Sequence, residues 1–185
     1  DSYYDMSKSN IDGFADSVDI IQTYKRKNDT ASRPDIDVTK DTFTVYLSGL
    51  DNMGSPDQQT RSDTNLILIV NPKANHIDMV SLPRDGYIPN AAYNYQNDKL
   101  THTGNDGIEN SVETIQNFFG IPIDYYARVS VNSLMESVDT IGGIDVDVEI
   151  SFSEQDENRS FNKEDLICLK KGKQHLNGKQ ALAYS

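Results

Sequence analysis

Three short polar segments in the first half of the chain carry the side chains that commonly bind phosphate groups: Asp51, Arg61-Ser62-Asp63 and Arg84-Asp85. Two carboxylates, Asp51 and Asp63, are what Mg²⁺ usually takes from a protein, while phosphate oxygens and waters complete its octahedron. The guanidinium groups of Arg61 and Arg84 can grip phosphate oxygens with paired hydrogen bonds. These residue types indicate metal-assisted phosphate chemistry. The alternative is that the arginines and aspartates only pair with one another and cap loops.

The predicted strands bring these segments to one end of a sheet. The sequence pattern predicts strands over residues 42–50, 65–70 and 76–82, and the short connector 71–75 makes the last two a hairpin. If the first strand is antiparallel to the second, all three polar segments lie at the same end.

A fourth segment, Asp98-Lys99-Leu100-Thr101-His102, leads from there toward a predicted helix. The N-terminus of that helix would add N–H donors and a partial positive charge. Lys99 adds a point charge, and His102 either donates to a phosphate or holds the loop.

The rest of the chain predicts two amphipathic helices and further strands. Apolar residues recur at helical spacing over residues 105–119, which Gly120 ends, and again after a cap at Asn132, as far as Gly142 and Gly143. Strands are expected over residues 123–131 and 144–150, a loop over 151–175, and a helix over 177–185. We therefore predict an α/β fold with a mixed central β-sheet flanked by α-helices, a three-layer α-β-α arrangement.

The chain divides into a polar N-terminal segment and a main domain. Residues 1–41 are rich in Asp, Ser and Lys and are expected to form a stalk or accessory segment. Ile11, Phe14, Val18 and Ile21 recur there at helical spacing, and a linker is expected over residues 29–41. Residues 42–185 form the predicted main domain.

Composition and charge exclude several classes of function. The 29 acidic against 17 basic residues give a net charge of -12, which argues against a nucleic-acid partner because duplex binding needs a basic stripe. The single Cys168 excludes an internal disulfide framework. The longest apolar run, residues 66–70, is far shorter than the roughly 20 residues that cross a bilayer.

Other candidate metal ligands are weaker. His76, His102 and His175 lack the spacing of a zinc site. Asp145-Val146-Asp147 lies in an alternating strand whose polar face would carry these carboxylates in any case.

Several motifs, taken together and in this order, resemble the LytR-CpsA-Psr family. They are FTVYLSGLD at 43–51, Arg61-Ser62-Asp63, SLPRD at 81–85, DKLTH at 98–102, IGGIDV at 141–146 and LNGKQALAY at 176–184. The resemblance covers the chain from about residue 42 to its last residue. It implies an extracellular, membrane-anchored catalytic domain of Gram-positive bacteria and their relatives, with the anchor outside this chain.

Enzymes of this family transfer a glycopolymer, such as wall teichoic acid or capsular polysaccharide, from a polyprenyl diphosphate carrier to peptidoglycan, forming a phosphodiester. The resemblance implies that Asp51 and Asp63 hold Mg²⁺ and that Arg61, Arg84 and Lys99 bind the diphosphate, with His102 beside them. Family members usually continue into an Arg-x-Arg motif that also binds the diphosphate. Because this chain stops at Ser185, we expect the domain to be truncated at its C-terminal end.

In the family the lipid tail lies in an apolar tunnel between sheet and helices. The candidate tunnel residues, which would equally suit an ordinary core, are Ile108, Val112, Ile115, Phe119, Leu134 and Val138. In the expected reaction a peptidoglycan hydroxyl attacks the sugar-linked phosphorus, and Asp63 or Asp85 takes its proton. These two aspartates, with Arg61 and Arg84, form the candidate catalytic set.

Two other classes of function use the same residues. A non-catalytic envelope regulator would bind polyprenyl phosphates without turnover. A lipid diphosphate hydrolase would use water as the nucleophile, and only analysis of the products separates it from a transferase.

Overall fold

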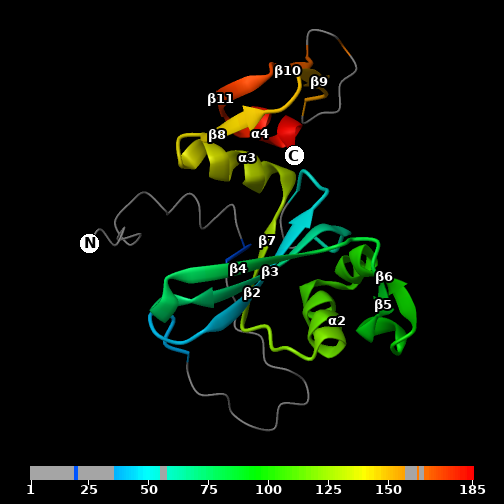
Figure 1. Cartoon of the computed structure of the whole chain (residues 1–185). Coiled ribbons are helices and arrows are strands. Elements are labelled where there is room, and N and C mark those ends of the chain that lie inside the picture. The colour runs from blue at the N-terminus through cyan, green and yellow to red at the C-terminus, as the bar shows by residue number, and fades with distance from the viewer. Residues whose placement is uncertain (1–18, 21–35, 55–57, 157–161, 163–164) are drawn as a thin grey trace. The chain divides into compact units, whose positions relative to one another are not determined.

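The computed structural model of the chain describes residues 19–20, 36–54, 58–156, 162 and 165–185 (Figure 1). The chain divides into two compact units: the larger contains the described residues from Asp19 to Val129, and the smaller contains those from Ser130 to Ser185. The helix predicted in the N-terminal segment and most of the predicted linker lie outside the described residues. At Asp19–Ile20 that helix prediction is wrong, because these residues form a short strand that pairs with Arg128 and Ala127.

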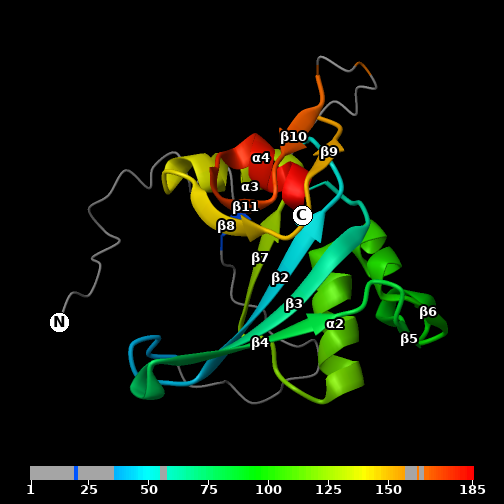
Figure 2. The same ribbon diagram turned by 45° about the horizontal axis from the view of Figure 1, so that its top comes forward.

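A five-stranded mixed sheet forms the centre of the larger unit (Figure 2). Its strands are β1 (Asp19–Ile20), β2 (Phe43–Leu50), β3 (Ser62–Asn71), β4 (His76–Leu82) and β7 (Tyr125–Val129). They lie in the order β1-β7-β2-β3-β4; β2 is parallel to β7, and every other neighbouring pair is antiparallel. The predicted α/β fold with a mixed sheet is confirmed, and so is the antiparallel pairing of the first two predicted strands.

The predicted hairpin between β3 and β4 also forms. Its turn contains the short 3₁₀ segment η1 (Pro72–Ala74), which Asn71 caps by accepting a hydrogen bond from the Ala74 N–H, and Asn75 adopts the left-handed conformation that the turn needs. β3, however, begins at Ser62 rather than at residue 65. Ser62 pairs with Leu50 beyond an irregularity in the ladder, so the polar triplet at 61–63 overlaps the start of the strand rather than preceding it.

Between β4 and β7 the chain forms a small hairpin, two 3₁₀ segments and the main helix of the unit. These elements are β5 (Tyr87–Pro89), η2 (Ala91–Tyr93), β6 (Asn97–Lys99), η3 (Leu100–Asp106) and α2 (Ile108–Phe119). The helix predicted from residue 105 begins only at Ile108, because Gly107, with φ +94, separates η3 from α2. Gly120 ends α2 in the left-handed conformation, as predicted.

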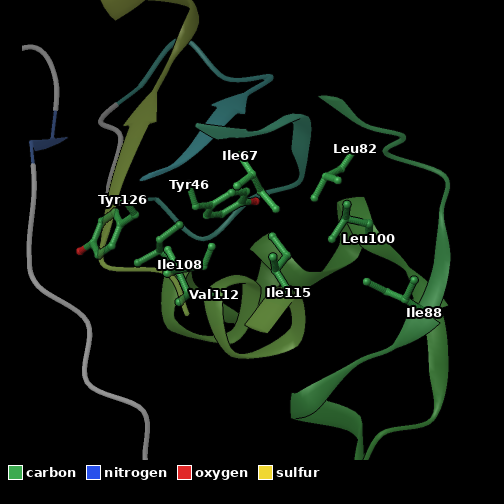
Figure 3. Close-up of a cluster of buried hydrophobic side chains, with 10 residues drawn as sticks. Tyr46, Ile67, Leu82, Ile88, Leu100, Ile108, Val112, Ile115 and Tyr126 are labelled. Carbon is green, nitrogen blue, oxygen red and sulfur yellow. The ribbon is translucent and has the colours of Figure 1, made fainter. Parts of the chain in front are cut away.

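The core of the larger unit lies between the sheet and α2 (Figure 3). Tyr46 from β2 and Val112 and Ile115 from α2 have no exposed surface. The helical spacing therefore predicted the buried positions of Ile108, Val112 and Ile115 correctly, whereas Phe119, expected on the same face, is 44% exposed. Burial of each such side chain contributes roughly 1.5–3 kcal/mol to stability.

The described part of the smaller unit combines two helices with two short antiparallel ribbons. Its elements are α3 (Val131–Thr140), β8 (Ile144–Val148), β9 (Phe152–Glu154), β10 (Ile167–Leu169), β11 (Gly172–Leu176) and α4 (Gly178–Tyr184). β8 pairs with β11 and β9 with β10, and Val148, Leu169 and Leu176 are buried together. α4 forms as predicted, with Asn177 and Gln180 making a reciprocal capping box.

Three predictions for the smaller unit are wrong. Residues 151–175 contain β9, β10 and most of β11 rather than a loop, because cross-strand pairing orders polar segments that bury only a few apolar side chains. β8, expected in the central sheet, pairs with β11 instead. α3 is capped by Ser130, whose Oγ accepts from the Ser133 N–H, rather than by Asn132.

Candidate functional site

The predicted phosphate-site residues all belong to the larger unit and follow from its strand ends. Asp51 directly follows β2, Asp63 lies at the start of β3, and Arg84 and Asp85 follow β4. The last pair of the β2–β3 ladder joins Leu50 to Ser62. Asp51 and Arg61 are the next residues beyond this pair, one on each strand. The antiparallel order brings these segments to one end of the sheet, as predicted.

Asp63 is the point where three segments meet. Its Oδ1 accepts a hydrogen bond of 2.9 Å from Thr101 Oγ1 on η3 and lies 3.3 Å from Arg84 Nη1. Thr101 is buried, and 23% of the Asp63 side chain is exposed. Among the described residues no group donates to Oδ2 of Asp63. One carboxylate oxygen is therefore fixed by the protein, and the other remains available to a ligand.

Asp85 lies between the two cations of the site. Lys99 Nζ donates to Asp85 Oδ1 at 2.6 Å, and Arg84 Nε lies 3.9 Å from Oδ2. The hydrogen bond from Lys99, and then its charge, hold the pKa of Asp85 below its ordinary value. Exposed ion pairs of this kind contribute little to stability, because water screens both charges. A phosphate that approached would therefore displace Asp85 from Lys99 and Arg84 at little cost.

The backbone of η3 is held against two other parts of the site. The Leu100 and Thr101 N–H groups donate to the carbonyls of Gly86 and Arg84, each at 2.8 Å. Gly104 packs so closely on Thr60 and Ser62 that a Cβ there would overlap the Thr60 carbonyl. Backbone hydrogen bonds and close packing therefore hold η3 against the turn after β4 and the start of β3.

His102 and Asp98 form a pair at the edge of the same cluster. His102 Nδ1 lies 2.8 Å from Asp98 Oδ1, which also accepts from the Lys99 N–H at 2.8 Å. Burial disfavours the charged form of Asp98, but the hydrogen bonds from His102 and Lys99 outweigh this and lower its pKa. With Nδ1 turned to Asp98, only Nε2 of His102 can face a ligand.

A buried polar network supports the start of β3. Ser62 Oγ lies 2.6 Å from Ser48 Oγ, 2.7 Å from Asn65 Oδ1 and 3.1 Å from Tyr46 Oη. Tyr46 donates to Asn65 Oδ1 at 2.5 Å, and its burial raises the pKa of the phenol. Ser62 and Asn65 both point into this network although they are three residues apart, because the irregularity of the β2–β3 ladder at Asp63 interrupts the alternation of side chains.

Four residues of this region were not given these roles from sequence. Thr101 and Asp98 lie inside the DKLTH segment, but only the fold shows that they hold Asp63 and His102. In the sequence, Ser62 was named only as the middle residue of the Arg61-Ser62-Asp63 segment. Arg128 on β7 is buried, and its Nη2 donates to the Gln58 carbonyl at 3.0 Å. Its alternation with Tyr126 at inward positions of β7 was the signal that could have singled it out.

The candidate tunnel residues occupy different surroundings. Ile108, Val112 and Ile115 are in the buried core against the sheet, whereas Phe119 is 44% exposed at the end of α2. Leu134 and Val138 lie on α3 in the smaller unit, where Val138 is buried. A role for these side chains in lining a tunnel stays a prediction.

The donor set fits Mg²⁺. Within the described residues no three or more His, Cys, Asp and Glu side chains gather into an all-protein metal site. Mg²⁺ does not require one, because it is usually bound through one or two carboxylates plus substrate phosphates and water. Asp51 and Asp63, from the adjoining ends of β2 and β3, are the carboxylates suited to that role.

Asp63, Arg84, Asp85 and Lys99 meet at one end of the mixed sheet of an α/β domain, a set of charges suited to binding phosphate. The chain belongs to the LytR_cpsA_psr family, whose family model matches residues 7–185. This confirms the family that the sequence motifs indicated. No helix of the described residues has the length and apolar character to cross a membrane.

Two curated relatives come from Bacillus subtilis. The polyisoprenyl-teichoic acid–peptidoglycan teichoic acid transferase TagV is 33% identical over 162 residues, covering 81% of this chain and 38% of TagV. TagU, a transferase with the same description, is 37% identical over 147 residues, covering 79% of this chain and 44% of TagU. The chain thus spans less than half the length of these relatives.

Solved structures of two proteins of this family are similar to the chain. The crystal structure of B. subtilis TagV matches with a TM-score of 0.68 and 34% identity, covering 79% of this chain and 55% of that one. The LytR-CPS2A-psr family protein YwtF (TagT) with bound octaprenyl pyrophosphate lipid matches with a TM-score of 0.66 and 28% identity, covering 88% and 61%.

Proposed function

We propose that this chain is part of a phosphotransferase that moves a glycopolymer from a polyprenyl diphosphate carrier onto a hydroxyl of peptidoglycan. The observation that carries the proposal is the meeting of Asp63, Arg84, Asp85 and Lys99 at one end of the sheet. The teichoic acid transferase activity of TagU and TagV and the lipid bound to TagT support the same class of substrate.

The cations of the site would bind the diphosphate. Arg84 and Lys99 are each about half exposed, and both lie beside Asp85, which a diphosphate would replace as a hydrogen-bond acceptor. Arg61, beside Asp63 at the start of β3, would add a third positive charge. Donors fixed in place before the reaction stabilise the charge that develops on the phosphoryl oxygens, where most phosphoryl-transfer catalysis resides.

Asp51 and Asp63 would hold Mg²⁺. When bound, the ion would neutralise charge on the phosphate oxygens. The contribution of the chain itself is to aim Asp63, because Thr101 and Arg84 fix its Oδ1 and leave Oδ2 toward the ligand.

The names of the curated relatives favour a teichoic acid over a capsular polysaccharide as the polymer. A lipid-linked donor and a peptidoglycan acceptor meet at the outer face of the cell membrane. We therefore propose that the protein acts there, attached to the membrane.

A titration with a water-soluble polyprenyl diphosphate, with and without Mg²⁺, tests the site. We expect Arg84→Ala to weaken binding, because a hydrogen bond to a charged group contributes about 1.5–3 kcal/mol, or roughly 10- to 100-fold in affinity. Asp63→Ala should abolish the response to Mg²⁺. Lys40→Ala is the matched control, since Lys40 is an exposed cation paired with Asp37 outside the site. Equal binding by Arg84→Ala and Lys40→Ala would reject the diphosphate site.

The rival functions separate in a second assay with a lipid-linked teichoic acid precursor and peptidoglycan oligomers. A transferase forms a polymer–peptidoglycan phosphodiester and releases polyprenyl phosphate. A hydrolase releases polyprenyl phosphate without the adduct. A regulator binds the lipid and releases nothing.

A further inference from the structure

The reaction needs a group that removes the proton of the acceptor hydroxyl, and the two aspartates expected for this task are poorly placed for it. Oδ1 of Asp63 already accepts from Thr101 and faces Arg84. Asp85 is hydrogen-bonded to Lys99 and lies beside Arg84, which stabilises its ionised form. A carboxylate that cations stabilise binds a proton weakly, so Asp85 is not a strong base, and Asp63 is the proposed metal ligand.

His102 has the geometry that they lack. A carboxylate can only accept hydrogen bonds, so the 2.8 Å contact with Asp98 places the proton of a neutral His102 ring on Nδ1. Nε2 then carries the lone pair. A histidine oriented in this way by an aspartate is the general-base arrangement of many hydrolytic and transfer enzymes.

The surroundings of His102 set it apart from the other two His–Asp pairs of the described residues. The side chains of His102 and Asp98 are 32% and 25% exposed. The values are 62% and 63% for His76 with Asp78, and 60% and 90% for His175 with Asp145. The His102–Asp98 pair is therefore the least exposed of the three, and it also lies beside the candidate phosphate site.

The charged groups near His102 come from two segments. Asp98 and Lys99 lie at the end of β6, and Asp85 and Arg84 lie in the turn after β4. His102 is close enough to Asp85 to contribute to the lowering of that aspartate's pKa. This places the ring within electrostatic reach of the residues that would hold the diphosphate.

We infer that His102, oriented by Asp98, is the general base that accepts the proton of the acceptor hydroxyl. The inference rests on the proposed phosphotransferase function. Nε2 takes the proton as the hydroxyl oxygen forms a bond to the sugar-linked phosphorus. The bond from that phosphorus to the bridging oxygen breaks, and polyprenyl phosphate leaves with the electron pair. The imidazolium then returns its proton to the leaving phosphate or to water.

The variant His102→Asn tests this, because its side-chain amide can still donate to Asp98 but cannot take the proton. General-base catalysis is worth about 10²- to 10⁴-fold, so we expect a fall in kcat of that size. The fall should come with loss of the acid limb of the pH–rate profile and with a Kd for polyprenyl diphosphate within about twofold of the wild type. His76→Asn is the matched control and should leave both measurements unchanged. Asp98→Asn, which can donate to Nδ1 and so stabilise the wrong tautomer, should also lower kcat by roughly 100-fold or more.

The outcomes separate the inference from the proposed function. If the wild-type protein forms no polymer–peptidoglycan adduct, the proposed function fails and the inference fails with it. If the wild-type protein is active and His102→Asn keeps its kcat or its acid limb, the function stands and His102 is not the base. Should His102→Asn not fold, Asp98→Asn decides alone, and wild-type kcat in that variant overturns the inference.

Discussion

Thr101 on η3 fixes the orientation of Asp63 on β3 through a hydrogen bond of 2.9 Å from Oγ1 to Oδ1. The two residues are far apart in the sequence and lie on different elements of the fold. Arg84 Nη1 approaches the same oxygen at 3.3 Å. Because Oδ1 is held, Oδ2 of Asp63 has a fixed direction. A metal ligand needs such a fixed direction.

Removal of the Thr101 hydroxyl should therefore weaken Mg²⁺ binding to the complex with diphosphate. We expect Thr101→Val to cost about 1.5 kcal/mol, or roughly tenfold in the Mg²⁺ dissociation constant, because the lost hydrogen bond goes to a charged group. Isothermal titration calorimetry with Mg²⁺ and a soluble polyprenyl diphosphate measures the change. Thr101→Ser keeps the hydroxyl and should stay near the wild type. Equal weakening by Val and Ser would indicate a packing role rather than orientation of Asp63.

Asp85 competes with phosphate for the cations of the site, so its neutralisation should strengthen anion binding. In Asp85→Asn, Lys99 and Arg84 lose an anionic partner that holds them at 2.6 and 3.9 Å. An exposed pair contributes up to about 1 kcal/mol, so we expect roughly two- to fivefold tighter binding of inorganic diphosphate. Asp78→Asn makes the same change of charge at an exposed position on β4 and is the control. Weaker binding than in Asp78→Asn would mean that Asp85 helps to hold the ligand.

The buried network under β3 should contribute to stability. Ser62→Ala leaves the buried Ser48 Oγ without its partner, while Tyr46 and Asn65 stay bonded to each other, and an unsatisfied buried polar group costs about 1–3 kcal/mol. Urea unfolding followed by circular dichroism measures the loss. Ser81→Ala, at an exposed position on β4, should change stability by less than about 0.5 kcal/mol. Matching midpoints for the two variants would show that the network does not hold β3 in place.

Local signals in the sequence predicted the parts of the structure that depend on local patterns. The alternation of β2, the turn at Asn71–Asn75 and the apolar face of α2 each follow from residues within a few positions of one another. The meeting of Asp63 and Arg84 followed from strand order, since three antiparallel strands return the chain to one end of a sheet. β9, β10 and β11 were missed because partners far along the chain order them.

The contacts that tune the site could not be predicted in this way. Thr101 with Asp63, and Ser62 with Ser48 and Asn65, join side chains whose closeness depends on how η3 and β2 pack on β3. Sequence alone also left Asp85 open as a base. Its engagement by Lys99 becomes visible only when β6 is placed beside the turn after β4.

In the smaller unit, the β8–β11 ribbon should be more stable at acidic than at alkaline pH because of His175. Its Nδ1 lies 2.8 Å from Asp145 Oδ1, and its Nε2 lies 2.7 Å from the Gly142 carbonyl. The hydrogen bond to Asp145, and then the one to Gly142, raise the pKa of His175 above its ordinary 6.5. Both ring nitrogens face acceptors, and only the imidazolium donates from both.

A pKa raised in the folded state means that the folded protein binds the proton more tightly than the unfolded chain does. The stabilisation is therefore complete below the unfolded value near 6.5, and it is lost as pH rises through the higher folded value. We expect His175→Gln to lower stability relative to the wild type at pH 5.5 and to approach the wild type at pH 9, which are about one unit below and two or more above the ordinary pKa. Nuclear magnetic resonance titration of the ring should give a midpoint above 6.5 for His175. His76→Gln removes an equally exposed histidine from β4 and controls for the loss of a charge. A stability difference for His175→Gln that grows toward pH 9 would contradict the bridging role of the imidazolium.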